Sequence, residues 1–213
     1  SYLLSLFHFQ KKSTPTGHKK YILTAFGSPV IPDRLEIHDP LTMNGNNSQL
    51  SLFHSLPSSK KEVNTIGRIF GYARIRLFLD KSFNKKQFET FAPQSSIVHI
   101  ATHFVNNVDY PQYSSLLFSP AGDSGPFYHA HEMFNLNLDT DLVVLSACET
   151  SEKHLSGFQG LRGMTAAFRH AGTRAMMVSM WPVDDHSWQL TPLFYFHYHK
   201  LVNKKPHDRI SPA

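Results

Sequence analysis

The chain has 213 residues, enough for one domain, and its 41% hydrophobic and 13% aromatic content is ordinary for a globular protein. No apolar run approaches the ~20 residues that a membrane helix needs, so we expect no membrane partner. The net charge of +5 comes from scattered pairs such as Lys11-Lys12 and Lys60-Lys61, without the interleaved aromatic residues of a nucleic-acid surface, so we expect no nucleic-acid partner.

The first half of the chain alternates strand and helix patterns with polar segments. The patterns predict strands over 20–26 and 74–79 and helices over 59–70 and 84–91, the first helix stopped by Gly71. Ser59-Lys60-Lys61-Glu62 has the spacing of a capping box, in which the Ser hydroxyl and the Glu carboxylate satisfy free amides of the first turn, and Asn84 to Gln87 repeats it. Residues 31–58, rich in Pro and Asn, predict a long irregular segment.

The second half of the chain continues the alternation. It predicts strands over 97–103, 115–118, 141–148 and 174–180, and helices over 129–134, 157–171 and 186–201. Pro192 either kinks the last helix or marks its first residue, with Thr191 as the cap. Strands and helices that alternate at these lengths predict an α/β fold, in which helices enclose a mainly parallel sheet.

Two of these strands end in residues that have catalytic chemistry. One ends in His103 and the other runs into Cys148, the only cysteine of the chain. Parallel strands finish at one edge of a sheet, which is where open α/β sheets bind their ligands. An imidazole beside a thiol favours the reactive thiolate and can protonate a leaving group, so the pair predicts nucleophilic catalysis. The residues alone leave open the alternative of a buried core cysteine and a structural histidine.

Other features bear on location, cofactors and domain boundaries. A single cysteine excludes an internal disulfide framework and favours a reducing, cytoplasmic location. The pairs His129/His131 and His197/His199 lack a matching set of Cys or carboxylate ligands, so we interpret them as surface or interface residues and expect neither a metal nor another cofactor. Because the chain starts without Met inside an apolar run, we expect residues 1–213 to be one domain cut from a longer protein. Whether residues 1–50 belong to its sheet is left open.

Four segments follow one another in an order and spacing that resemble a known family. They are Ile97 to His103, Leu145 to Thr150, Gly157 to Gly172 and Ser179 to Asp185. Together they resemble the CHAT domain, a caspase-like domain that is similar to caspases, separases and gingipains and is commonly attached to tetratricopeptide repeats. The resemblance is dense over residues 95–200, thinner over 50–94 and weak before residue 50. It implies a three-layer α/β/α caspase-like sandwich with a mainly parallel central sheet.

The resemblance also implies an activity. It implies a cysteine endopeptidase that cleaves a protein or peptide partner through a His103–Cys148 dyad, gated by other regions of the parent protein such as tetratricopeptide repeats. The Cys148 thiolate would attack the peptide carbonyl, and the backbone amides of Cys148 and Phe104 would hold the oxyanion. His103 would protonate the departing amine. Phe104 stands where CHAT domains usually have Gly.

Substrate recognition is expected just after the strand over 174–180. Ser179 and Trp181 would line the substrate groove, and Asp184 and Asp185 resemble the position where separases use an acid to read a basic residue. Two alternatives stay open: Trp181 as a core residue that caps the sheet edge, and Asp185 as the cap of the following helix. His99, four residues before His103, is expected to be a buried structural histidine below the site.

Two other functions are compatible with the same residues. The first is a non-catalytic caspase-like interaction module that binds peptides in the groove without cleaving them, an alternative that Phe104 favours because a side chain there restricts the backbone next to the histidine. The second is a thiol acyltransferase or esterase that uses the same dyad on a different acyl group.

Overall fold

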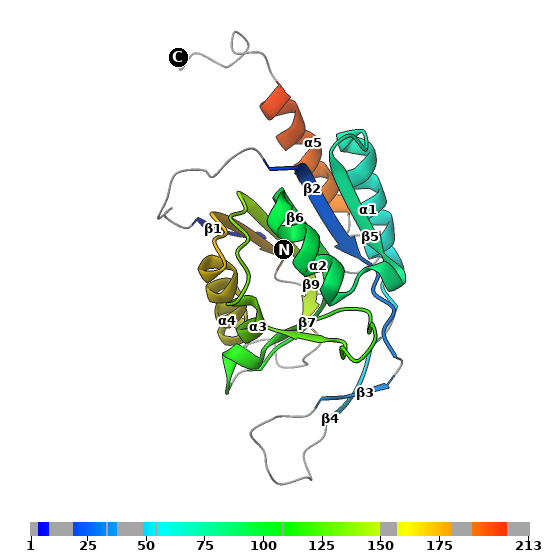
Figure 1. Cartoon of the computed structure of the whole chain (residues 1–213), viewed down its shortest axis with the longest axis vertical. Coiled ribbons are helices and arrows are strands. Elements are labelled where there is room, and N and C mark those ends of the chain that lie inside the picture. The colour runs from blue at the N-terminus through cyan, green and yellow to red at the C-terminus, as the bar shows by residue number, and fades with distance from the viewer. Residues whose placement is uncertain are drawn as a thin grey trace.

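The computed structural model describes residues 4–8, 19–32, 34–37, 49–53, 55–107, 109–149, 157–179 and 189–203. Eight of the described strands form one open sheet, in the order β1-β10-β9-β6-β2-β5, with β7 attached to β6 and β8 attached to β7 (Figure 1). These strands are β1 (Leu4–His8), β2 (Tyr21–Gly27), β5 (Ile75–Leu79), β6 (Ser95–Val105), β7 (Ser115–Leu117), β8 (Phe127–His129), β9 (Leu142–Glu149) and β10 (Ala175–Ser179). A separate antiparallel pair consists of β3 (Arg34–Ile37) and β4 (Gln49–Leu52).

The sheet is mixed, so the prediction of a mainly parallel sheet is wrong. β10, β9, β6, β2 and β5 run parallel to one another. β1 pairs antiparallel with β10 at one edge, and the β7–β8 hairpin continues antiparallel from the end of β6. A short connection can join only antiparallel neighbours. The short connection between β7 and β8 turns at Gly122, whose φ is 58°. The pairing of β1 places residues 4–8 in this sheet, which the sequence left open.

Helices cover both faces of the sheet, because successive side chains of a buried strand point to opposite sides. They are α1 (Pro57–Phe70), α2 (Lys85–Phe91), α3 (Ala130–Met133), α4 (Gly157–His170) and α5 (Leu190–Asn203). On one face Ile97, Ala101 and Val144 of the sheet pack with Val63 and Ile66 of α1 and Tyr195 of α5. On the other face Val98, Ile100 and Val143 pack with Phe88 of α2, Met133 of α3 and Phe168 of α4.

The start of α1 differs from the prediction. The helix begins at Pro57 with Leu56 as its N-cap residue, because proline suits the first position of a helix and its missing N–H costs nothing there. The Ser59 hydroxyl donates to the Leu56 carbonyl oxygen, and Glu62 is buried with 1% of its surface exposed. The capping-box interpretation of Ser59 to Glu62 is therefore wrong. The predicted stop at Gly71, which has φ 72°, is confirmed.

Other predicted elements are confirmed with small shifts. Asn84 caps α2 by accepting a hydrogen bond from the Gln87 amide, which is the Asn84 half of the expected capping box. The segment 31–58 was predicted to be irregular but contains β3 and β4, and β8 was missed because three residues are too short for a periodic signal. Pro192 is the third residue of α5, within the first turn, where no intrahelical hydrogen bond is lost.

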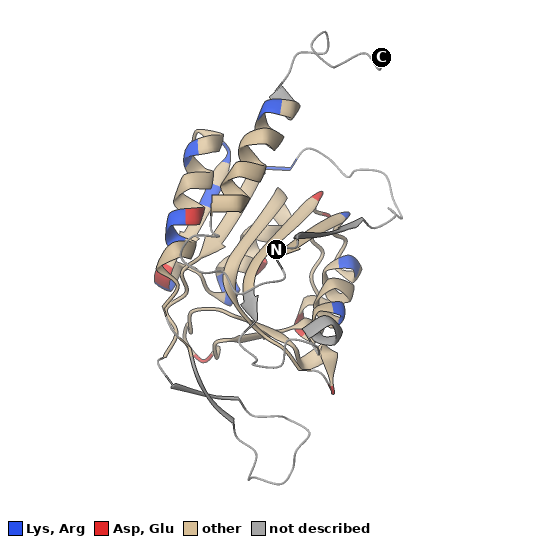
Figure 2. Ribbon diagram, turned by 180° about the vertical axis from the view of Figure 1, so that it is seen from behind, with Lys and Arg blue, Asp and Glu red and all other residues tan. Residues whose placement is uncertain are grey.

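Charged side chains lie mainly outside the sheet. β2, β6 and β10 contain no Asp, Glu, Lys or Arg, and Figure 2 shows Lys and Arg on the helices around largely uncharged strands. In the part of the chain that the structure describes, no helix combines the length and apolar character needed to span a bilayer.

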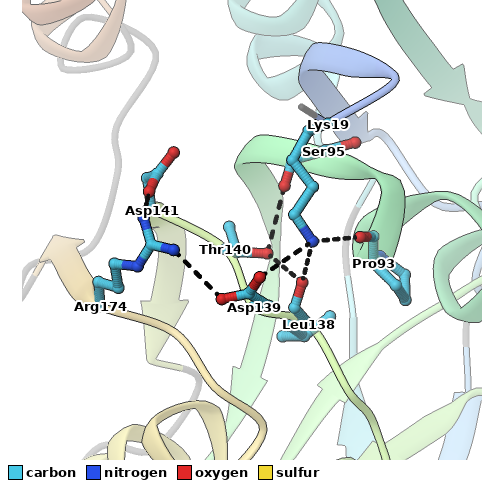
Figure 3. Close-up of polar contacts among 8 residues, drawn as sticks. All are labelled: Lys19, Pro93, Ser95, Leu138, Asp139, Thr140, Asp141 and Arg174. Carbon is cyan, nitrogen blue, oxygen red and sulfur yellow. Dashed lines mark hydrogen bonds and ion pairs between the residues drawn. The ribbon is translucent and has the colours of Figure 1, made fainter. Parts of the chain in front are cut away.

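A polar network joins the amino-terminal ends of the parallel strands (Figure 3). Lys19, just before β2, donates from Nζ to the carbonyl oxygens of Pro93 at 2.8 Å and Leu138 at 2.9 Å. Asp139 lies 3.9 Å from the same Nζ and accepts from Arg174, which also pairs with Asp141. Burial lowers the pKa of Lys19, and the nearby Asp139 opposes this shift. The network ties segments from four parts of the chain at the edge opposite to the strand ends that carry His103 and Cys148.

Phe104 is part of the core on the α2–α4 face of the sheet. Its side chain is 5% exposed and belongs to the cluster that contains Leu116, Phe118 and Met164. The residue lies within β6 in extended backbone, where glycine is not required. Phe104 therefore fills a packing role that the glycine usual in CHAT domains does not have.

Replacing Lys19 by Met is expected to lower the free energy of unfolding by about 1–3 kcal/mol, because the two carbonyl oxygens lose their donor. The measurement is a urea denaturation curve. Lys86→Met, on the exposed surface of α2, is the control and should change stability by less than about 0.5 kcal/mol. Equal effects of the two substitutions would contradict a structural role for the network.

Phe104→Ala is expected to cost about 3–5 kcal/mol of stability, because it removes a buried ring from a packed core. Phe104→Gly, which restores the residue usual in CHAT domains, should cost at least as much. Thermal and urea unfolding measure both. Phe134→Ala, at a side chain that is 39% exposed, is the matched control and should cost less than about 1 kcal/mol. A small loss in Phe104→Ala would show that the ring does not stabilise the core.

Candidate active site

The structure brings the positions of His103 and Cys148 together. β6 and β9 are adjacent parallel strands, and their register pairs His103 with Cys148 and Phe104 with Glu149. Adjacent strands lie ~4.8 Å apart, and register partners in a parallel pair belong to the same face of the sheet. Both positions lie near the carboxyl ends of their strands. This is the arrangement that the sequence predicted from two apolar strands ending in a histidine and a cysteine.

His103 is held in a nearly closed environment. Its side chain is 5% exposed, and the ring of Phe53 meets the imidazole edge-on with 5.3 Å between ring centroids. Phe53 follows β4 and packs with Val105 and Leu117. Phe53 is not recognisable from the sequence, because it lies in a segment without periodicity and a single aromatic residue does not indicate which residue it contacts.

Phe104 follows the histidine without turning away from the sheet. Its register partners are Glu149 in β9 and Leu116 in β7, so β6 continues past His103. Its ring packs in the core on the face opposite to His103. The side chain that replaces glycine at this position therefore occupies the core rather than the face that carries the imidazole.

A group of buried polar side chains lies below the His103–Cys148 positions, between the sheet and helices α1 and α5. Its members are Glu62 of α1, His99 of β6, Ser146 of β9, and Thr191 and Tyr195 of α5. The Ser146 hydroxyl donates to Glu62 Oε2 at 3.1 Å, and His99 Nε2 lies 3.5 Å from Glu62 Oε1. The ring centroids of His99 and Tyr195 are 5.7 Å apart. The predicted burial of His99 is confirmed, whereas Glu62 was not recognised as part of the site.

The pKa values of this group follow from its burial. Burial raises the pKa of Glu62 to about 8, although hydrogen bonds from Thr191 and Ser146 oppose the shift. Burial lowers the pKa of His99 to about 3 and raises the pKa of Tyr195. At neutral pH the carboxyl, the imidazole and the phenol are therefore all uncharged.

The predicted substrate-binding residues are described only in part. Ser179 is the last residue of β10 and pairs with Leu4 of β1. Trp181, Asp184 and Asp185 lie outside the described residues. The register of β10 with β9 ends at the pair Val178 and Leu145, whereas that of β6 with β9 continues to Glu149.

The histidine pair on β8 and α3 contacts backbone oxygens. His129 Nδ1 lies 3.0 Å from the carbonyl oxygen of Tyr113, and His131 Nδ1 lies 3.2 Å from that of Gln112. Among the residues that the structure describes, no group of three or more His, Cys, Asp or Glu side chains is arranged to hold a metal ion.

Comparison with known proteins identifies the family. A search of curated proteins finds no match. The family model of the CHAT domain matches residues 4–209, nearly the whole chain and further toward the amino terminus than the motifs alone indicated. The match includes the strands that carry His103 and Cys148 and the buried Glu62. The chain belongs to the CHAT domain family, which is related to the caspase-like peptidases.

Proposed function

We propose that this chain is a cysteine endopeptidase of caspase-like architecture, with Cys148 as nucleophile and His103 as acid–base. The observation that carries the proposal is the register of β6 and β9, which pairs the two positions near one edge of the sheet. Helices on both faces of the sheet support the caspase-like sandwich as its fold. Membership of the CHAT family supports the reaction class.

The proposed reaction begins with transfer of the thiol proton to His103. The Cys148 thiolate attacks the carbonyl carbon of a peptide bond and forms a tetrahedral oxyanion, which the backbone amides of Cys148 and Phe104 stabilise. His103 then gives its proton to the amine as the C–N bond breaks. Water hydrolyses the thioester, releasing the acid and restoring the thiol. The two amides are assigned from the family resemblance, and their residues lie on adjacent strands, where Phe104 pairs with the residue after Cys148.

The substrate in this proposal is an extended segment of a protein partner. β1 occupies one edge of β10 up to Ser179, and the pairing of β10 with β9 stops at Leu145. A substrate strand would lie beside the end of β9, close to Cys148, with Trp181 as the floor of an apolar subsite. Asp184 and Asp185 would read a basic residue before the cleaved bond.

Access to the site is proposed to be regulated. His103 is 5% exposed beneath Phe53, so a substrate reaches the imidazole only after a covering segment moves. Other regions of the parent protein, such as tetratricopeptide repeats, would control that movement in the cytoplasm, a location that the single cysteine favours.

The structure removes the sequence-based reason for a non-catalytic interaction module. It was favoured by Phe104 in place of glycine, since a side chain there was expected to restrict the backbone beside His103. The ring lies in the core on the other face, and the backbone is ordinary strand. No described feature favours binding without cleavage.

The dyad is tested with a peptidyl electrophile and a peptide library. Because Cys148 is the only cysteine, wild type should take up one label, and Cys148→Ala should take up none and cleave no peptide. His103→Ala is expected to slow cleavage by ~10²–10⁴, the range of general acid–base catalysis. His131→Ala, at an exposed histidine, is the control and should match wild type. Cleavage that survives in Cys148→Ala would rule out the mechanism.

The acidic subsite is tested by the residue before each cut. Mass spectrometry of library products should show Lys or Arg at this position. Asp184→Asn and Asp185→Asn should slow cleavage after basic residues by roughly tenfold, because an attractive charge is lost. Asp123→Asn, in an exposed turn, serves as the control. Cuts after other residue types would remove the acidic subsite from the proposal while leaving the dyad in place.

A further inference from the structure

A buried carboxyl group contacts both strands that carry the proposed dyad. Glu62 reaches from α1 to His99 of β6 and to Ser146 of β9. Side chains repeat with a period of two along a strand, so His99 shares a face with His103, and position 146 shares a face with position 148. Glu62 therefore lies on the dyad's face of the sheet, one layer below it.

The Ser146 contact lies close to the proposed nucleophile. In the register of β9 with β6, Ser146 pairs with Ala101 and Cys148 pairs with His103. The Ser146 hydroxyl donates to Glu62 Oε2 at 3.1 Å, from the face of the sheet that α1 covers. Glu62 therefore restrains β9 from outside the plane of the sheet, two residues before Cys148.

Glu62 makes these contacts without a charge. It is 1% exposed, and among the described residues the titratable groups that face it are His99 from β6 and Tyr195 from α5, both fully buried. β2 and β5 present apolar side chains to α1, including Leu23, Ala25 and Ile75, while β9 and α5 present the hydroxyls of Ser146 and Thr191. An ionised carboxylate in these surroundings would lose its hydration without a cation to replace it. A protonated carboxyl can donate one hydrogen bond and accept others.

We propose that Glu62 is a positioning residue for the Cys148–His103 dyad, restraining the catalytic ends of β6 and β9 through its packing contact with His99 and the hydrogen bond that it accepts from Ser146. The inference rests on the proposed function, because the dyad is what Glu62 positions. A thiol and an imidazole exchange a proton only within hydrogen-bond reach, so a small displacement of the end of β9 weakens their coupling. Loss of Glu62 raises the pKa of the thiol and slows its reaction.

The test is the pH dependence of iodoacetamide alkylation of the folded protein, which reports on Cys148 alone. Glu62→Leu and Ser146→Ala are each expected to raise the midpoint of the pH–rate profile of alkylation by about one pH unit. Each should also slow alkylation at neutral pH about tenfold. Glu62→Gln should stay within about twofold of wild type, because a neutral amide keeps a donor and an acceptor. Glu89→Leu, on the exposed side of α2 across the sheet, is the control and should leave the profile unchanged.

His103→Ala separates this inference from the proposed function. If it leaves the alkylation profile unchanged, no dyad exists and both proposals fail. If it raises the midpoint while Glu62→Leu and Ser146→Ala match wild type, only the role of Glu62 is overturned. Slowing in Glu62→Gln equal to that in Glu62→Leu would also overturn it, because the neutral contact would then be insufficient. Near-UV circular dichroism verifies folding. If Glu62→Leu does not fold, the alkylation profile of Ser146→Ala tests the positioning role of Glu62.

Stability provides a second readout that a merely apolar contact would not give. The folded pKa of Glu62, about 8, lies above the ordinary 4.5, so its contribution is full below pH 4.5 and is lost as pH rises through 8. The folded pKa of His99, about 3, lies below the ordinary 6.5, so its contribution is full above pH 6.5 and is lost as pH falls through 3. Between pH 4.5 and 6.5 the falling contribution of Glu62 and the rising contribution of His99 offset each other, so the free energy of unfolding should be constant. Above pH 6.5 only the fall due to Glu62 remains, so the free energy of unfolding should decline toward pH 8. Urea denaturation should show that Glu62→Gln removes the decline; its persistence would contradict an uncharged Glu62.

Discussion

The parallel register of β6 and β9 is the constraint on which the site depends. A slip of one residue would move His103 to the face opposite to position 148, because side chains alternate along a strand. Burial on both faces prevents such a slip: Val143 packs toward α4 and Val144 toward α1 and α5. A slip that exchanged the faces of Val143 and Val144 would also move every other side chain of β9 to the opposite face of the sheet. The core residues that look least functional therefore fix the pairing of histidine and cysteine.

The distribution of charge follows from the same sheet. Ion pairs lie at its amino-terminal edge, where Lys19, Asp139 and Arg174 keep part of their surface in water. The polar groups inside are uncharged, because burial raises the pKa of Glu62 and lowers that of His99. Charge at the partly exposed edge ties the strands together, and neutral hydrogen bonding inside avoids the large cost of a buried ion.

Part of this site could be predicted from the sequence and part could not. His103 and Cys148 were found because each ends a run of apolar residues that leaves few alternatives to a buried strand. Glu62 was misread because Ser-x-x-Glu before an apolar stripe is also a capping pattern, and moving the helix start to Pro57 turns the carboxyl inward. Phe53 and the direction of β1 depend on contacts between distant segments, which no local pattern contains.

A nucleophile at the end of a strand faces two opposing requirements. In the proposed reaction, a substrate strand needs an open position beside the nucleophile. A thiol that must stay within hydrogen-bond reach of an imidazole also needs a strand that does not move. A contact from outside the sheet plane resolves the conflict, since it restrains β9 without occupying its edge. Glu62 meets Ser146 from α1, across the face of the sheet, and so satisfies both requirements at once.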